Sequence, residues 1–185
     1  MTYFDDYRDS LNAAMSTVDV AKVEELRELL VRARAEGRTI FTCGNGGSAS
    51  TASHFATDLL KGASYGRDQK FRVIAVTDAS STISAYSNDV GYEVVYEEQL
   101  KNFLIPGDVV VAISGSGNSE NVVRALQFAR STGAHAVALT GRDGGALGQA
   151  ATLHINVAEH HMGRIEDAHL AICHMLAFSF IDTEE

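Results

Sequence analysis

The chain has 185 residues, a formal net charge of −9 at pH 7 and 45% hydrophobic residues. The acidic balance argues against nucleic-acid or membrane partners, because both need a basic surface, and the ordinary hydrophobic content excludes disorder as a class. No apolar run approaches the roughly 20 residues that a membrane span requires, and we expect one globular domain over residues 1–185.

Apolar residues recur at helical spacing through the first 36 residues, and they predict an N-terminal pair of helices at 2–17 and 19–36. From residue 37 onward, short β-rich runs alternate with helical segments. We predict strands at residues 39–43, 71–76, 109–113, 136–140 and 153–157. We predict helices near residues 48–61, 81–88, 91–103, 119–132, 144–150 and 163–182. The last strand alternates in hydrophobicity, which is typical of an edge strand.

This alternation predicts an α/β fold, a three-layer sandwich with a mostly parallel five-stranded sheet. The N-terminal helical pair covers residues 1–36, and the α/β core with its C-terminal helix covers residues 37–185. Ligands of such sheets bind beyond the carboxyl ends of the strands. We therefore expect the functional residues just after residues 43, 76, 113 and 140.

Two cysteines, Cys43 and Cys173, are too few for a disulfide scaffold. The residues ahead of Asp5 and Asp6 do not resemble a signal peptide. We therefore expect a reducing, cytoplasmic location, with Cys43 buried in a strand and Cys173 on a helix face.

The first strand is followed by Gly44-Asn-Gly-Gly-Ser48. Glycines let the backbone approach a ligand, and Ser48 is predicted to cap the next helix with its hydroxyl facing an anion. The spacing matches neither a dinucleotide-binding loop nor a Walker loop. Asn45, Gly46 and Ser48 are therefore candidate substrate-binding residues, and the alternative is a plain glycine turn.

The third strand is followed by Ser114-Gly-Ser-Gly-Asn-Ser119, directly before a predicted helix. Hydroxyl groups and backbone N–H groups at a helix N-terminus suit a phosphate monoester. Ser114, Gly115, Ser116 and Ser119 are therefore candidate phosphate-binding residues. The alternative is a solvated turn, and the presence of two such loops at successive strand ends makes it less attractive.

Two histidine–carboxylate pairs share helical spacing. His54 and Asp58 are four residues apart, and Glu166 and His174 are eight apart, so each pair lies on one helix face. Brought together, the two pairs would form a four-coordinate site of two nitrogen and two oxygen ligands, which suits zinc. Taken separately, each pair could equally be a solvated stabiliser of its helix.

The two loops together resemble the sugar isomerase (SIS) domain, which has a flavodoxin-like fold. With His54-Phe-Ala-Thr-Asp58 and the segment from Arg164 to His174 added, the chain is more narrowly similar to the sedoheptulose 7-phosphate (phosphoheptose) isomerases. The resemblance runs in register over nearly the whole chain. It implies an aldose–ketose isomerisation of a phosphorylated seven-carbon sugar through an enediol(ate) intermediate.

The resemblance also implies a set of roles. One Zn²⁺ per subunit would be held by His54, Asp58, Glu166 and His174. Asp58 is then the candidate catalytic base and His174 the candidate acid/base, although a metal-bound carboxylate is less basic and the base assignment stays open. The positions matching Asn88 and Asp89 touch the sugar. The family forms homotetramers with sites at subunit interfaces.

This sequence departs from the family pattern at three positions. Asp58 stands where Glu is usual, Glu166 where Gln is usual, and Gly115 where Thr is common. The shorter acid and the added negative charge bear on which sugar is the substrate and which metal is bound. Two alternatives stay open, namely an isomerase for another ketose phosphate and a non-catalytic tetramer that binds a partner protein or senses sugar phosphates.

The remaining histidines have weaker interpretations. His135 and His154 lie at strand edges and are expected to be structural or exposed, and His160 and His161 are expected to face solvent. His169 follows Glu166 by three residues. It is expected either to support the site from behind or to contact a neighbouring subunit.

Overall fold

Five strands form one fully parallel sheet in the computed structural model, which describes residues 2–183. The strands are β1 (Thr39–Gly44), β2 (Arg72–Ala75), β3 (Val109–Ser114), β4 (His135–Gly141) and β5 (Leu153–Val157). Their order is β2-β1-β3-β4-β5, so β5 lies at an edge as predicted. The pairing of Ile40 with Val109, and of Val109 with His135, sets the register that brings the carboxyl ends of β1, β3 and β4 to one side.

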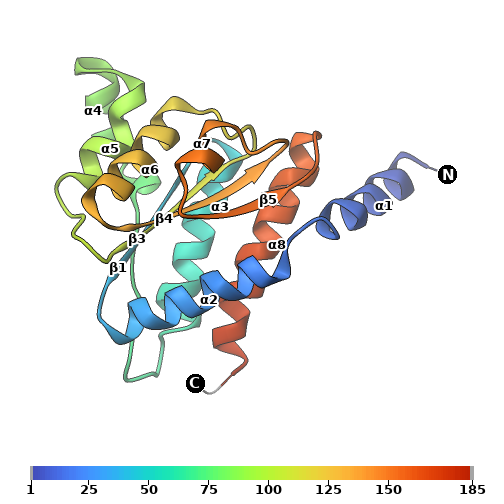
Figure 1. Cartoon of the computed structure of the whole chain (residues 1–185), viewed down its shortest axis with the longest axis horizontal. Helices are drawn as coiled ribbons and strands as arrows, with labels where there is room; N and C mark the ends of the chain where they lie inside the picture. The colour runs from blue at the N-terminus through green and yellow to red at the C-terminus, as the bar shows by residue number, and fades with distance from the viewer. Residues whose placement is uncertain (1, 184–185) are drawn as a thin grey trace.

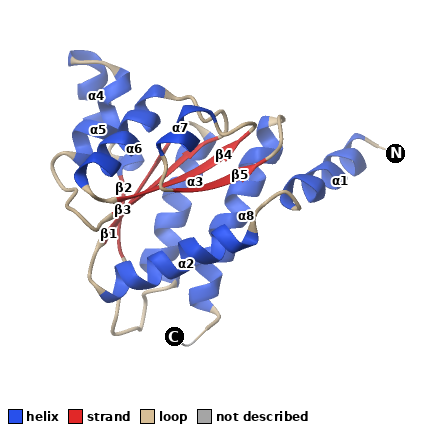
Figure 2. Cartoon of the chain, in the orientation of Figure 1, coloured by secondary structure: helices blue, strands red, loops and turns tan. Residues whose placement is uncertain are grey.

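Both faces of the sheet are covered by helices (Figure 2), which explains the nearly continuous apolar runs in the central strands. Successive strand residues point to opposite faces. Val109 and Val111 therefore pack in a cluster with the helices that cover one face, whereas Val110 and Ala112 pack in a cluster with the helices that cover the other. The three predicted layers are confirmed.

The first helical layer contains α2 (Val20–Ala35), α3 (Gly47–Thr57) and α8 (Met162–Ile181). Asp19 caps α2 by accepting a hydrogen bond from the Ala21 N–H. Helix α8 buries residues at three- and four-residue intervals, so one stripe faces the sheet while the opposite side stays open. Figure 1 shows α3 and α8 on the same side of the sheet, and they contact each other along their lengths.

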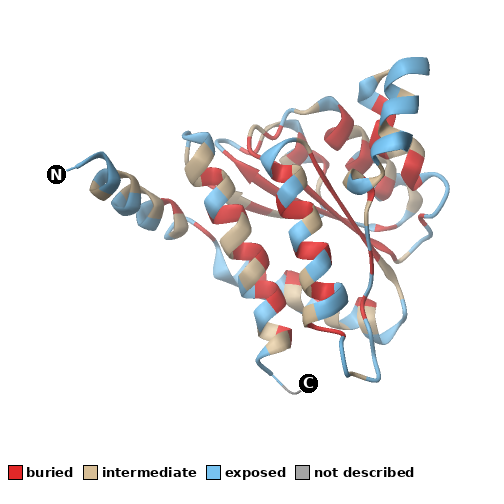
Figure 3. Cartoon of the chain, turned by 180° about the vertical axis from the view of Figure 1, so that it is seen from behind, coloured by how far each residue is buried: buried red, intermediate tan, exposed pale blue. Residues whose placement is uncertain are grey.

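The second layer contains α4 (Ser80–Asp89), α5 (Val95–Leu100), α6 (Glu120–Thr132) and α7 (Gly145–Ala150). Helix α6 is amphipathic, and it buries Val122, Ala125, Leu126 and Ala129 against β3 and β4. Helix α4 buries none of its residues, and it is mostly exposed when the molecule is seen from behind (Figure 3). Its face is therefore open for contacts outside this chain.

Helix α1 (Tyr3–Met15) extends away from the sheet (Figure 1). Thr2 begins it with a capping box in which Asp5 is the reciprocal partner. Ala14 is buried, whereas Phe4 is 79% exposed. A hydrogen bond of 2.6 Å from the Tyr7 hydroxyl to Asp167 joins the helix to the start of α8.

Two predicted helices differ in detail from the structure. The helix predicted at 48–61 ends as an α-helix at Thr57 and continues as a π-helical turn, Asp58–Gly62. The predicted helix 91–103 is a 3₁₀ turn (Tyr92–Val94) followed by the short α5, which ends at Leu100 and leads through turns to β3. In the described residues, no helix has the length and apolar character to cross a bilayer.

Ile155 on β5 provides a test of the core. Its side chain is fully buried between the sheet and the first helical layer. Ile155→Ala is expected to lower the free energy of unfolding by about 2–5 kcal/mol, because it removes buried methyl groups and leaves a cavity. Urea denaturation measures the change. Ile105→Ala, at a position that is 54% exposed, is the matched control and should change stability much less; equal losses would contradict the described core.

Candidate active site

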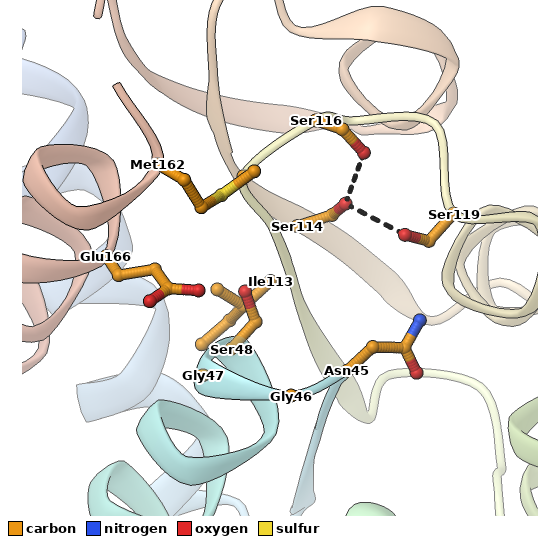
Figure 4. A pocket seen from close by; sticks show the side chains of 11 residues that line it. Asn45, Gly46, Gly47, Ser48, Ile113, Ser114, Ser116, Ser119, Met162 and Glu166 are labelled. Atoms are coloured by element: carbon orange, nitrogen blue, oxygen red, sulfur yellow. Dashed lines mark hydrogen bonds between the residues drawn. The ribbon is translucent and has the colours of Figure 1, made fainter. Parts of the chain in front are cut away.

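A cavity of about 260 Å³ opens at the carboxyl ends of β1 and β3 (Figure 4). It is lined by Asn45, Gly46, Gly47, Ser48, Ile113, Ser114, Gly115, Ser116, Ser119, Met162 and Glu166. The two loops that the sequence singled out thus form one pocket, with α8 as its third wall. The parallel topology brings them together, since β1 and β3 are neighbours in the sheet.

The loop Ser114–Ser119, which we call the serine loop, supplies three hydroxyl groups to this pocket. The Ser114 Oγ lies 3.4 Å from both the Ser116 and the Ser119 Oγ (Figure 4). Ser119 is the N-cap of α6, so the helix N-terminus faces the same space. Because no Lys or Arg lines the cavity, an anion there would be held by neutral donors and by the helix dipole.

The loop 44–48 leads into α3, but the N-terminal cap of this helix differs from the prediction. The N-cap is Gly46, with a φ of 54°, and the helix begins at Gly47, so Ser48 is not the cap. The tight turn places the N-cap two residues before Ser48. Ser48 is nevertheless nearly buried and lines the pocket.

Asn45 is held by residues that the sequence analysis missed. Its side-chain Nδ2 donates to the Asn121 Oδ1 at 2.8 Å, and its Oδ1 accepts hydrogen bonds from the hydroxyls of Tyr92 and Tyr96. Burial raises the pKa of Tyr96 to about 12, so its phenol stays protonated and donates. The partners lie 47 to 76 residues away in the chain, and no local pattern marks them.

His54, Asp58 and His174 come together on the open side of the α3–α8 pair. The His54 Nε2 lies 3.4 Å from the Asp58 Oδ2 and 3.1 Å from the His174 Nε2, and the His174 Nε2 lies 3.8 Å from the same carboxylate oxygen. The pairing of α3 with α8 therefore joins one residue of the second predicted pair to the first pair. We call these three residues the His–Asp group.

The His–Asp group fits a tetrahedral metal site. Ligand atoms placed about 2.1 Å from a tetrahedral Zn²⁺ lie roughly 3.4 Å from one another, and the three observed separations bracket that value. The Asp58 Oδ2 is buried and has no hydrogen-bond partner among the described residues. His54 is exposed and His174 half-buried, so a fourth ligand position would be open to solvent.

Glu166 lies elsewhere. Its carboxylate packs against Gly47 at the start of α3, where a Cβ would come within 2.5 Å of it, and it lines the pocket. It is not in the group of potential ligands found among the described residues. The fourth predicted ligand thus faces the pocket from α8 (Figure 4), and its metal role stays a prediction.

Asn88 and Asp89 are also separate from the pocket. They border an exposed hollow on α4, together with Ser80, Ser81 and Ser84. The Asn88 Nδ2 donates to the Asp89 Oδ1 at 2.6 Å. Within the described part of this chain, these two predicted sugar-binding residues do not join the other candidates.

Both cysteines and three of the other histidines lie outside the pocket and the His–Asp group. Cys43 and Cys173 are buried and unpaired with each other, as expected. His169 is completely buried because its face of α8 packs on the sheet. Of its two predicted roles, the contact with a neighbouring subunit is therefore wrong, and support of the site from behind stays a prediction. His154 is half-buried and hydrogen-bonded to Thr140 at 2.6 Å, whereas His135 is exposed at the start of β4.

Comparison with known proteins shows which family this chain is similar to. The SIS domain model matches residues 2–141. The phosphoheptose isomerase of Bordetella avium is 42% identical over 156 residues, which are 80% of this chain and 77% of the relative. The probable phosphoheptose isomerase of Thermoplasma volcanium is 36% identical over 179 residues, 96% of this chain and 90% of the relative.

Solved structures agree with the sequence comparison. A phosphoheptose isomerase from Neisseria gonorrhoeae superposes with a TM-score of 0.88 at 29% identity, covering 98% of this chain and 96% of that one. A phosphoheptose isomerase from Francisella tularensis gives a TM-score of 0.90 at 26% identity, covering 99% of this chain and 100% of that one. The similarity therefore extends over the whole architecture, α1 and α8 included.

The burial of His169 predicts a pH effect on stability. Burial lowers its pKa to about 4 from an ordinary value of 6.5, so the folded chain holds it neutral. Its contribution to stability is complete above pH 6.5 and is lost as the pH falls towards 4, by an amount on the order of 3 kcal/mol. Denaturation of His169→Asn should show a flatter decline over this window than the wild type. The exposed control His135→Asn should parallel the wild type; identical curves for His169→Asn would contradict the assignment.

The His–Asp group predicts the outcome of a metal-binding measurement. Asp58→Asn keeps the side-chain shape but removes the anionic oxygen, so zinc affinity should fall by at least about 100-fold, as expected when a direct ligand is lost. Isothermal titration calorimetry with zinc alone measures this. Asp68→Asn, at an exposed loop position, is the matched control; equal affinities in the two variants would contradict the site.

Proposed function

The chain belongs to the phosphoheptose isomerase family of SIS-domain proteins, and from this premise we propose that it converts sedoheptulose 7-phosphate into glycero-manno-heptose 7-phosphate. It is an aldose–ketose isomerase. The substrate, the zinc ion and the residue roles are the proposed parts. Their support comes from the geometry of α3 and α8.

The observation that carries the proposal is the parallel packing of these two helices. At their N-terminal ends Glu166 packs on Gly47 beside the pocket, and further along His54 and His174 meet with ring centres 4.9 Å apart. Six residues separate Ser48 from His54 and eight separate Glu166 from His174, which at a rise of about 1.5 Å per residue gives roughly 9–12 Å. An open-chain sugar that carries its phosphate on the terminal carbon furthest from the carbonyl spans a distance of this order.

The serine pocket then anchors the phosphate. Ser114, Ser116 and Ser119 offer hydroxyl donors beside the N-terminus of α6, and Ser48 lines the same cavity from α3. Since hydrogen bonds to a charged acceptor are stronger than neutral ones, this set holds a phosphate without a cationic side chain. The fixed phosphate directs the carbonyl end of the sugar towards the His–Asp group.

The isomerisation moves a proton between neighbouring carbons. A base removes the proton from C1 of the ketose, the enediol(ate) forms, and a proton returns at C2 while the hydroxyl proton moves between O1 and O2. Asp58 is the proposed base through the carboxylate oxygen that a metal would leave free, and His174 is the proposed carrier of the oxygen-bound proton through the ring nitrogen that a metal would leave free. Zinc held by His54, Asp58 and His174 would supply Lewis-acid stabilisation of the developing oxyanion.

Glu166 and Asn45 complete the proposed sugar contacts. Both border the pocket, and Asn45 is held in one orientation by Asn121 and two tyrosines. The Glu166 carboxylate lies across the cavity from the serine cluster (Figure 4), so it would accept hydrogen bonds from sugar hydroxyls while the phosphate stays at the serine side.

We further propose a homotetramer with sites at subunit interfaces. Two features support it. Asn88 and Asp89 lie on the exposed α4, away from the pocket of their own chain. Leu60, Met175 and Phe178 are 42–48% exposed near the His–Asp group, and a neighbouring subunit would cover them. A cytoplasmic location and a single-domain organisation stay predictions.

The two alternatives make different demands on the site. A tetramer that only bound a partner or sensed a sugar phosphate would need the serine pocket but not the His–Asp group, whose three ligand atoms converge in this chain. An isomerase for another ketose phosphate would keep both. The shorter Asp58 and the acidic Glu166 are the features through which such a substrate change would act.

The direct test is NMR of sedoheptulose 7-phosphate incubated with the zinc-supplemented protein. Aldose anomeric signals that appear with zinc and disappear with a chelator would establish the proposed reaction. No conversion by protein that binds zinc would indicate another sugar phosphate. No conversion and no zinc binding would favour the binding-protein alternative.

His174→Gln provides the matching mutational test. It removes a proton carrier and a metal ligand from a half-buried position, so turnover should fall by at least about 100-fold, in keeping with the loss of an acid/base group, while the unfolding midpoint changes little. His135→Gln, at an exposed site on β4, should keep wild-type activity. Full activity in His174→Gln would remove this residue from the mechanism.

A further inference from the structure

The loop after β4 packs directly on the serine loop. A Cβ at Gly117 would collide with the Gly144 carbonyl oxygen, and one at Gly145 would lie 2.7 Å from the Gly117 carbonyl oxygen. The backbone of one loop therefore lies directly on the backbone of the other at Gly117, and the Asn118 side chain packs equally closely on Gly145. A shift of residues 144–145 would move Gly117, which lies between Ser116 and Ser119.

Hydrogen bonds couple the same two segments. The first turn of α7 donates from the Leu147 N–H to the Gly117 carbonyl at 2.8 Å and from the Ala146 N–H to the Asn118 Oδ1 at 3.0 Å. Asn118 in turn donates from its Nδ2 to the Ser116 carbonyl and from its backbone N–H to the Ser116 Oγ. Two successive hydrogen bonds, both involving Asn118, therefore connect the first turn of α7 to the Ser116 hydroxyl.

His154 fixes α7 from the other side. Its imidazole occupies the space that side chains would take at Gly144 and Gly148, where a Cβ would lie 2.6 Å and 2.5 Å from the ring. The ring is wedged between the N-cap residue of α7 and the middle of that helix. The absence of a Cβ at both glycines is what gives it room.

A polar network orients that ring. The Thr140 hydroxyl donates to the Asn156 Oδ1 at 2.7 Å and lies 2.6 Å from the His154 Nε2. Since a hydroxyl has one proton, the His154 Nε2–H must be the donor to Thr140. The Asn156 Nδ2 donates to the carbonyl of Arg142, a residue held at a φ of 54°. The network therefore holds the whole turn in the conformation that contacts the serine loop.

We propose that His154 is a positioning residue for the anion-binding serine loop, acting through Thr140, α7 and Gly117. The proposal rests on the proposed function only in taking the Ser114–Ser119 loop as the phosphate site. It assigns a role to a histidine that touches neither the pocket nor the His–Asp group. The imidazole keeps α7 at one distance from the loop, and the three hydroxyls keep their common orientation.

The test measures binding of inorganic phosphate alone, so it does not depend on turnover. His154→Ala and Thr140→Val should each weaken phosphate binding about tenfold, the effect of a partial loss of hydrogen bonding to the anion. The double variant should be no worse than either single one, because both act through one network. His154→Gln, which retains a donor near the Nε2 position, should restore most of the affinity. His135→Ala is the exposed control.

Turnover and zinc binding give the second readout. In the variants the KM for the sugar phosphate should rise while kcat stays within about twofold, as expected when binding alone is impaired, and zinc affinity should not change. Unaltered phosphate binding in folded His154→Ala and Thr140→Val, with normal binding in the wild type, would overturn the positioning role and leave the proposed function intact. A wild-type chain that binds no phosphate would overturn both.

Discussion

The close, parallel contact between α3 and α8 is the constraint on which the candidate site depends. Gly47 permits it at one end, since a side chain there would occupy the space of the Glu166 carboxylate. Further along the same two helices, the His54 and His174 side chains contact each other. One helix pair therefore sets both a wall of the proposed phosphate pocket and the separation between that pocket and the His–Asp group.

The pocket presents neutral hydrogen-bond donors on a rigid scaffold. Parallel β1 and β3 end side by side, so the starts of α3 and α6 face one space, and helix N-termini favour anions. Without a lysine or arginine among the lining residues, the proposed affinity for phosphate would depend on how well the hydroxyls are oriented. The proposed positioning role of His154 follows from this, because residues outside the pocket hold Gly117 in place.

The sequence predicted the fold and the local pairs well. Strand–helix alternation and apolar strands reveal a covered parallel sheet, and the i,i+4 spacing places His54 beside Asp58, because these signals are local. It did not reveal that Gly46 caps α3, that Glu166 packs on Gly47, or that Asn45 is held by Tyr92, Tyr96 and Asn121. These contacts join residues far apart in the chain, and which helix faces meet is decided by packing rather than by periodicity.

The most direct test of the account is the distance between the two ends of the site. Mn²⁺ bound at the His–Asp group should accelerate the ³¹P relaxation of bound sedoheptulose 7-phosphate by an amount corresponding to about 10 Å, the separation set by the helix rise. The same sample with Zn²⁺ gives the diamagnetic reference. A phosphorus at coordination distance from the metal, or one whose relaxation Mn²⁺ does not change, would contradict the claim that the pocket and the His–Asp group hold opposite ends of one substrate.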